Sequence, residues 1–287
     1  MTEVERVLPV QNQLGEGPLW NPLEKALYWV DIEGHCFHRY FPDTGTHETY
    51  SIGQPIGCLA FRPSGDLVMA VRDGIGFWDF TSKRFQLAVK PEEGRENARF
   101  NDGKVDKQGR FWSGTIGENQ ESSLFRFDPD GSINTMETGI SISNGIGWSP
   151  DDKTMYYTDS PLRVVYAYDF DSESGSIRNR RAFIQVPAEH GLPDGLTVDQ
   201  EGFVWSAHWD GWRITRYDPE GKVERVILLP VQRPTSCTFG GAELNQLYIT
   251  SARTGLDESD LREQPLAGNL LRIQTEITGQ EENKYLG

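Results

Sequence analysis

The chain has 287 residues, of which 28 are Lys or Arg and 43 are Asp or Glu, so its formal net charge is −15. This acidic balance argues against nucleic acid or an anionic membrane as a partner, because phosphate binding needs a basic surface. No apolar run approaches the roughly 18 residues that a membrane-spanning helix requires.

The N-terminal stretch "MTEVERVLPVQNQLGEG" has neither the basic region nor the apolar region of a signal peptide. The three cysteines, Cys36, Cys58 and Cys237, are an odd and widely spaced set, which is not a disulfide framework. Both features predict a protein of the reducing cytoplasm.

Six segments in chain order share one shape, in which a short strand is followed by a polar turn and a stronger strand. They are "GEGPLWNPLEKALYWV", "IGCLAFRPSGDLVMAV", "NDGKVDKQGRFWSGT", "SNGIGWSPDDKTMYYT", "PDGLTVDQEGFVWSAH" and "TSCTFGGAELNQLYIT". The first apolar residue of the stronger strand recurs at spacings of 40, 44, 44, 49 and 43 residues. A period in the low forties, filled with strands and tight turns, is typical of propeller blades.

The sequence therefore predicts an all-β fold, a six-bladed β-propeller with four-stranded antiparallel blades, as a single domain over residues 1–287. The head "VERVLPV" is expected to pair with the last blade and close the ring, which removes exposed edges. The alternative is a generic β-sandwich with frequent turns, but a sandwich has no reason to repeat at this period.

The phase of the repeat places polar residues at equivalent positions. The residue that enters the first strand is Glu16 in the first unit, Asn101 or Asp102 in the third, Asn144 in the fourth and Asp194 in the fifth. Because first strands line the central channel of a propeller, these side chains are expected to meet at one mouth of that channel.

Carboxylate and amide oxygens without Cys or His suit a hard cation such as Ca²⁺ or Mg²⁺. A cation would also relieve the repulsion between two carboxylates that share a channel mouth. The alternative interpretation is that the Asp-Gly and Asn-Gly pairs are only turn formers. Several pairs in phase, together with Glu16, a poor turn residue, favour a site.

The loops that follow the second strands are expected on the same face, where they form a rim. They carry "DIEGH", "GTIGENQ", "TDSP" and "SAHWDGW". The guanidinium of Arg99 supplies hydrogen-bond donors in a fixed planar arrangement, and Trp209 or Trp212 offers an aromatic surface on which a ligand ring can stack.

The motifs "LGEGPLW", "RFNDGKVDKQGRFWSGT", "SNGIGWSPD", "YYTDS", "LPDGLTVDQEGFVW" and "TSCTFGG" resemble those of the SMP-30/gluconolactonase family. That family is a six-bladed propeller and includes regucalcin and bacterial sugar lactonases. The resemblance implies that Glu16, Asn144 and Asp194 bind the metal, with Asp194 also the general base.

By the same resemblance, Arg99 and Asn101 bind substrate, which favours Asn101 over Asp102. A further rim contact falls on Glu118 or Asn119, where this sequence departs from the family's pattern. The expected cofactor is one divalent cation, and oxygen ligands admit Ca²⁺, Mg²⁺, Mn²⁺, Zn²⁺ or Fe²⁺.

The expected activity is the metal-dependent hydrolysis of a small-molecule sugar lactone to the aldonic acid, by a monomer or weak homo-oligomer. One alternative is a metal-dependent phosphotriesterase- or esterase-type hydrolase, which a small, apolar rim would favour. The other is a non-enzymatic Ca²⁺-binding propeller, since a fold does not fix a function.

Overall fold

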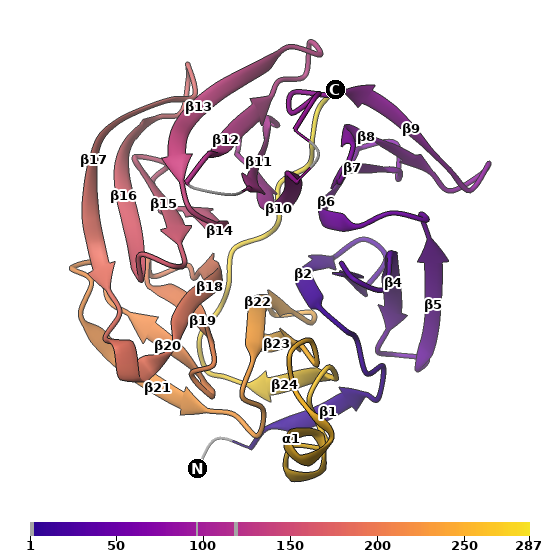
Figure 1. Ribbon diagram of the computed structural model, residues 1–287, viewed down its shortest axis with the longest axis vertical. Helices are drawn as coiled ribbons and strands as arrows, with labels where there is room; N and C mark the ends of the chain where they lie inside the picture. Colours follow the sequence, from indigo (N-terminus) through magenta and orange to yellow (C-terminus); the bar gives the residue numbers. More distant parts are fainter. Residues whose placement is uncertain (1–2, 96, 118–119) are drawn as a thin grey trace.

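A computed structural model describes residues 3–95, 97–117 and 120–287. Six four-stranded antiparallel sheets are arranged as blades around a central axis, which confirms the predicted six-bladed propeller (Figure 1). The helices of the described residues are all too short and polar to cross a membrane.

The first three blades use strands β2 to β13 in chain order. Blade 1 contains β2 (Gly15–Asn21), β3 (Ala26–Asp31), β4 (Cys36–Phe41) and β5 (Thr46–Ser51). Blade 2 contains β6 (Ile56–Phe61), β7 (Leu67–Val71), β8 (Gly74–Asp79) and β9 (Arg84–Val89). Blade 3 contains β10 (Arg99–Val105), β11 (Phe111–Ile116), β12 (Ser122–Phe127) and β13 (Ile133–Ile140).

The remaining blades follow the same plan, with two short helices in their loops. Blade 4 contains β14 (Ser143–Trp148), β15 (Thr154–Asp159), β16 (Val164–Asp171) and β17 (Ser176–Gln185). Blade 5 contains β18 (Leu192–Val198), β19 (Val204–Trp209), β20 (Arg213–Tyr217) and β21 (Val223–Leu228). Blade 6 contains β22 (Pro234–Gly240), β23 (Gln246–Ser251), β24 (Leu270–Gln274) and β1 (Glu5–Leu8), and the helices are η1 (Ala188–His190) and α1 (Glu258–Glu263).

The ring is closed by strands from both ends of the chain. Strand β1 pairs antiparallel with β24, so the N-terminal head supplies the outer strand of the last blade, as predicted. This pairing leaves blade 6 complete without a fourth strand from its own segment.

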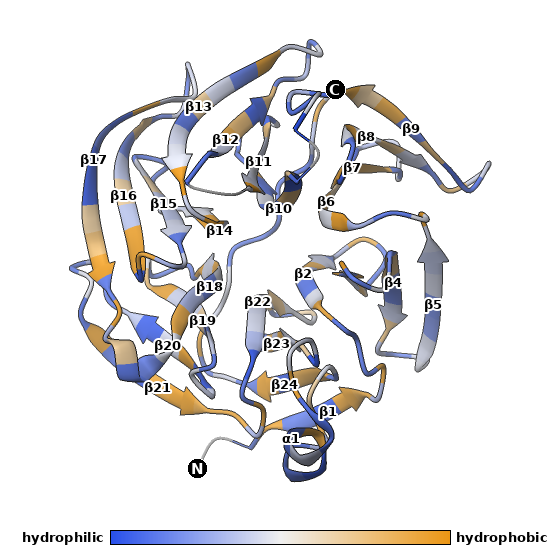
Figure 2. Cartoon of the chain, viewed as in Figure 1, coloured by the Kyte–Doolittle hydropathy of each residue, from blue (hydrophilic) through white to orange (hydrophobic). Residues whose placement is uncertain are grey.

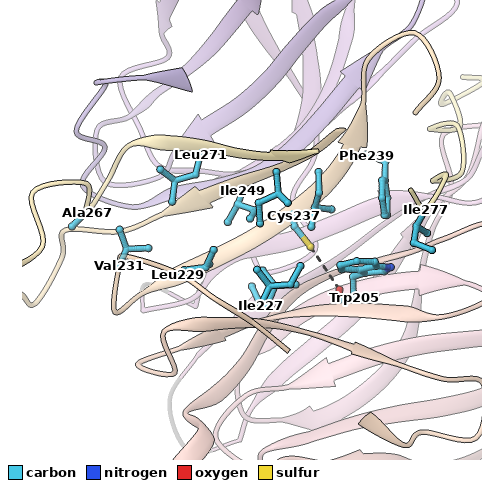
Figure 3. Close-up of a cluster of buried hydrophobic side chains, with 14 residues drawn as sticks. Trp205, Ile227, Leu229, Val231, Cys237, Phe239, Ile249, Ala267, Leu271 and Ile277 are labelled. Carbon is cyan, nitrogen blue, oxygen red and sulfur yellow. Dashed lines mark hydrogen bonds between the residues drawn. The ribbon is translucent and has the colours of Figure 1, made fainter. Parts of the chain in front are cut away.

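The core lies between neighbouring blades, where their faces pack together. Strands β3 and β7 are buried along their whole length, whereas the outer strand β9 alternates between exposed and half-buried residues. Figure 2 shows the hydrophilic stretch on the outer strand β17. Between blades 5 and 6, the ring of Trp205 meets that of Phe239 edge-on at 5.5 Å between centroids (Figure 3).

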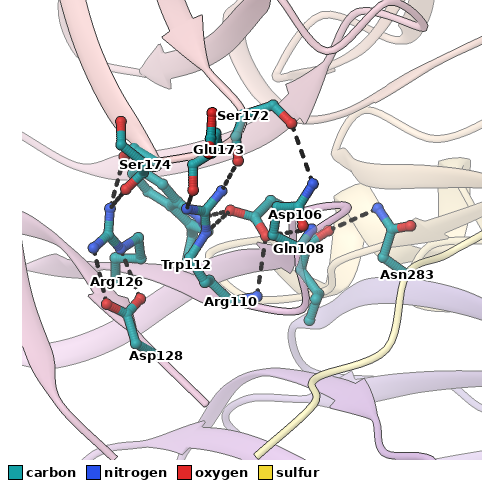
Figure 4. A network of polar contacts seen from close by, with 12 residues as sticks. Asp106, Gln108, Arg110, Trp112, Arg126, Asp128, Ser172, Glu173, Ser174 and Asn283 are labelled. Atoms are coloured by element: carbon teal, nitrogen blue, oxygen red, sulfur yellow. Dashed lines mark hydrogen bonds and ion pairs between the residues drawn. The ribbon is translucent and has the colours of Figure 1, made fainter. Parts of the chain in front are cut away.

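The turns at the far end of the channel from the predicted site are held by buried aspartates. In blade 3, Asp106 accepts hydrogen bonds from Arg110 Nε at 2.6 Å and from Trp112 Nε1 at 2.9 Å (Figure 4). In blade 5, Asp199 accepts from Trp205 Nε1 and Arg216 Nε in the same way, at 2.8 and 2.9 Å. The shared motif "VD-x-x-G" followed by Trp thus encodes a local clamp on the turn.

The C-terminal tail, residues 278–287, crosses this same end of the channel (Figure 1). Its backbone bonds Leu244 of blade 6, Phe61 of blade 2 and Gly109 of blade 3. Within the tail, Glu282 forms an ion pair with Lys104 of β10 at 3.0 Å. The tail therefore joins blades that are distant in sequence and covers one mouth of the channel.

Candidate active site

All six innermost strands have an irregular register at the end opposite the tail. The breaks lie at Glu16/Leu19, Ile56/Cys58, Phe100/Gly103, Asn144/Ile146, Pro193/Leu196 and Pro234/Ser236. A bulge adds twist and re-aims the side chains beside it. The repeat therefore places a bulge at the position where the sequence carries its in-phase polar residues.

Four of these polar side chains line one cavity of about 300 Å³. They are Glu16 of β2, Asn101 of β10, Asn144 of β14 and Asp194 of β18, and each residue is only 5–6% exposed. We call these four residues the floor. Four blades contribute one residue each, so residues up to 178 positions apart in the sequence meet at one mouth of the channel.

The glycines that follow two of the floor residues, Asn144 and Asp194, have a packing role. Asn144-Gly145 and Asp194-Gly195 lie inside strands β14 and β18, not in turns. A Cβ on Gly145 would lie 2.6 Å from the backbone nitrogen of Leu196 in the next blade, and a Cβ on Gly195 would lie 2.2 Å from Ser236 Oγ. The inner strands approach each other so closely that only glycine fits there.

A chain of hydrogen bonds links the floor. Arg99 Nη1 donates to Asn101 Oδ1 at 2.8 Å, and Asn101 Nδ2 donates to Asn144 Oδ1 at 3.1 Å. Asn144 Nδ2 donates to Ser160 Oγ at 2.9 Å, and Ser160 Oγ donates to the carbonyl of Pro193 at 2.6 Å. Each amide is thereby oriented by its neighbours.

Ser160 has a role that sequence reasoning missed. It was expected at the rim, but its residue is only 6% exposed and its hydroxyl fixes the orientation of the Asn144 amide. The only signal in the sequence was the position of "TDSP" on the same face.

The two floor carboxyl groups are electrostatically unfavourable in their charged forms. Burial, together with the nearby Asp194 and Asp102, raises the pKa of Glu16 well above its usual value. Burial and the nearby Asp102 likewise raise the pKa of Asp194, and burial raises the pKa of Asp102 to about 6. Arg99 opposes these shifts at Glu16 and Asp194.

The donor set fits one hard cation. Glu16 and Asp194 supply carboxylate oxygens and Asn144 supplies an amide oxygen, which are the ligands that Ca²⁺ and Mg²⁺ take in proteins. A bound cation would offset the burial of two negative charges. Within residues 3–95, 97–117 and 120–287, no group of three His, Cys, Asp or Glu side chains could hold a metal, so a site here depends on the amide.

Some of the other predicted residues line the cavity, some lie elsewhere, and two are outside the described residues. Arg99 lines the cavity beside Asn101, whereas Asp102 lines a cavity of about 20 Å³ deeper in the channel. Glu118 and Asn119 lie outside the described residues. Of the two candidate tryptophans, Trp209 lines the cavity, and Trp212 is 41% exposed and is not part of its lining.

Two acids expected at the rim hold the backbone instead. Asp31 accepts hydrogen bonds from the backbone N–H groups of Gln13 and Leu14, both at 2.9 Å. Asp159 accepts from those of Ser141 and Ile142 in the equivalent loop of blade 4. They fix the loops that lead into β2 and β14, and so position Glu16 and Asn144 indirectly.

A larger cavity of about 540 Å³ lies beside the site, among loops of blades 1 to 3. Its lining includes both basic and acidic side chains, such as Arg95 and Glu92, which pair at 2.7 Å. Since the perturbed acids line the smaller cavity, that cavity is the better candidate for chemistry.

Known proteins resemble this chain in sequence and in fold. A model of the SMP-30/gluconolactonase/LRE-like region matches residues 14–253. Regucalcin of Xenopus laevis is 37% identical over 280 residues, 94% of each chain, and Pentonolactonase XacC of Haloferax volcanii is 37% identical over 285 residues, 97% of each chain. The crystal structure of a calcium-binding protein, regucalcin, from Agrobacterium tumefaciens superposes with a TM-score of 0.95 at 26% identity, covering 99% of this chain and 97% of that chain.

Proposed function

Because the chain belongs to the SMP-30/gluconolactonase/LRE-like family, we propose that it hydrolyses a sugar lactone to the aldonic acid with one divalent cation. The observation that carries the proposal is the pair of buried carboxyl groups, Glu16 and Asp194, which share a cavity floor with the Asn144 amide. Pentonolactonase XacC, a relative of matching length, supports the choice of substrate class.

The cation would be held by Glu16, Asn144 and Asp194. When bound, it would polarise the lactone carbonyl and lower the pKa of a water molecule. Ca²⁺, Mg²⁺, Mn²⁺, Zn²⁺ and Fe²⁺ all accept such oxygen ligands, and availability decides among them. The regucalcin structure that is named as calcium-binding supports a divalent ion.

Asp194 acts as the general base. It takes a proton from the water whose oxygen attacks the carbonyl carbon, and it returns that proton to the ring oxygen when the C–O bond of the lactone breaks. One water is consumed and one hydroxy acid is formed.

Arg99 and Asn101 orient the substrate. The bonds that Arg99 makes within the described residues use only Nη1, so Nε and Nη2 can donate to a substrate oxygen. Asn101 is held by its own bonds to Ser143 and Asn144 and is therefore rigid. Arg99 thus offers fixed donors, and Asn101 Oδ1, which accepts one bond from Arg99, keeps a second lone pair for a substrate hydroxyl. Fixed groups of this kind hold the substrate in a reactive geometry.

The test measures acid release from pentono- and hexonolactones by chelated protein, before and after each divalent ion is restored. We expect activity only with a restored ion, above the spontaneous hydrolysis of each lactone. Calorimetry should count one bound ion per chain.

Turnover that persists after complete chelation would refute the metal requirement. Tight Ca²⁺ binding without turnover of any lactone or aryl ester under any ion would favour the non-enzymatic Ca²⁺-binding propeller. Hydrolysis of phosphotriesters with all lactones inert would favour the other hydrolase.

A further inference from the structure

A second tier of side chains lies above the floor. Three of its members, Leu14, Ile142 and Leu192, precede Glu16, Asn144 and Asp194 by two residues, as Arg99 precedes Asn101. Because side chains two apart in an extended segment point to the same side, each of these four blades places one such residue directly above its floor residue. Ile116 and Trp209, the strand partners of Arg99 and Leu192, complete the lining.

We call Leu14, Ile116, Ile142, Leu192 and Trp209 the wall. All five residues are half-buried, as is Arg99, which is the exposure expected for side chains that face a cavity. Among the described lining residues, Arg99 is the only charged group in this tier. As far as the described residues line it, the upper part of the cavity is therefore mostly apolar, with the guanidinium of Arg99 on one side.

The polar groups of the floor have little capacity left for substrate hydroxyls. Asn101 Nδ2 donates to both Ser143 and Asn144, and Asn144 Nδ2 donates to Ser160. Trp209 carries the only polar side-chain group of the described wall residues, its indole N–H. A hydroxyl that faces one of the four aliphatic wall residues would lose its water and find no side-chain partner there. Burying an unpaired hydroxyl in this way costs as much as a lost hydrogen bond.

We propose that the preferred substrate is a lactone whose non-reacting part is apolar, namely a deoxy-sugar or alkyl-substituted lactone. This inference rests on the proposed lactonase function and narrows its substrate class. The reacting ester lies at the floor, one substrate oxygen is held by Arg99, and the remaining carbons contact the wall. A cavity of about 300 Å³ accommodates one small ring with a short substituent.

The experiment compares kcat/KM for three lactones with the same six-membered ring. They are D-glucono-1,5-lactone, its 6-deoxy analogue and the alkyl-substituted δ-octanolactone. We expect kcat/KM to rise in that order, by about tenfold for each hydroxyl lost from the part that faces the wall.

Equal or higher kcat/KM for the polyol lactone would overturn this inference and leave the proposed lactonase function intact. The absence of turnover for every lactone would overturn both. These two failures are therefore distinguishable.

A pair of variants tests the wall directly. Ile142→Asn adds hydrogen-bonding groups to the wall, so the ratio of kcat/KM for δ-octanolactone to that for gluconolactone should fall by about tenfold or more. Leu162→Asn is the matched control, because Leu162 lies on the same face, is 42% exposed and is not part of the cavity lining.

An unchanged ratio in folded Ile142→Asn, or an equal fall in Leu162→Asn, would contradict the role of the wall. If circular dichroism shows that Ile142→Asn does not fold, Leu192→Asn makes the same test from blade 5. Binding of an unreactive alkyl δ-lactam, measured by calorimetry, should weaken in the wall variant and not in the control.

Discussion

The two mouths of the central channel differ in whether their buried acidic side chains form ion pairs with basic side chains. At the cavity, Glu16 and Asp194 are 5% exposed, and no ion pair within the described residues joins either of them to a basic side chain. At the opposite mouth, Asp106 pairs with Arg110 at 2.6 Å and Asp199 with Arg216 at 2.8 Å.

The paired acids at one mouth stabilise the fold, whereas the acids at the cavity, which have no basic partner in the described part of the chain, mark the candidate functional site. In a buried ion pair each charge is neutralised by its partner, and the pair fixes the turn in which it lies. Buried carboxyl groups that repel each other are costly for the fold, and they persist where a ligand compensates for them.

The largest expected effect is on activity at the cavity. Asp194→Asn removes the proposed general base, so kcat/KM for the best lactone should fall by about a thousandfold or more. The measurement uses saturating divalent cation, with circular dichroism to check the fold. Activity above one tenth of that of the unmodified protein would remove Asp194 from the proton transfer.

The same variant should change stability in the opposite direction. A carboxyl group whose pKa is raised by folding contributes stability below its unfolded pKa of about 4 and loses it as pH rises through the folded pKa. Asparagine does not titrate, so metal-free Asp194→Asn should exceed the unmodified protein in Tm by more at pH 8 than at pH 5. A variant that is less stable at pH 8 would contradict the electrostatic account.

At the opposite mouth, Asp199→Ala should cost stability without affecting turnover per folded molecule. It leaves the guanidinium of Arg216, 3% exposed as a side chain, without its most buried partner. Arg216 keeps its ion pairs with Glu201 and Glu224, so we expect a loss of about 3 kcal/mol in the free energy of unfolding, measured by urea titration.

Asp218→Ala is the matched control for Asp199→Ala. Asp218 accepts hydrogen bonds from Glu220 and Lys222 just as Asp199 accepts from Glu201 and Phe203, but without a buried ion pair. The control should lose about 1 kcal/mol. Equal losses in the two variants would show that the turn, and not the ion pair, carries the stability.

The smallest expected effect is on the support of the floor. Ser160→Ala removes the acceptor that orients the Asn144 amide, so calorimetry should find divalent cation binding weaker by about tenfold. Ser64→Ala changes an exposed hydroxyl in a turn and serves as the control. Unchanged affinity in Ser160→Ala would assign the hydroxyl to packing alone.

Much of the architecture was predictable because a propeller repeats one local pattern. The spacing of the stronger strands predicted six blades, and the phase of the repeat singled out Glu16, Asn144 and Asp194 before any contact was known. It left Asn101 and Asp102 open, because a bulge in β10 decides which of two adjacent side chains faces the cavity. A bulge depends on how two strands pair, so the sequence of one strand alone does not show where it lies.

The sequence by itself determined which kinds of group occupy equivalent positions, because strand period and turn chemistry are local properties. Only the tertiary structure decided what those groups meet. It placed Ser160 of blade 4 against Asn144 and Pro193, and it ran Glu282 of the tail beneath the channel to Lys104. The contact with Pro193 joins two blades and the contact with Lys104 joins the tail to blade 3, so their geometry follows from how the ring closes and not from any stretch of the chain.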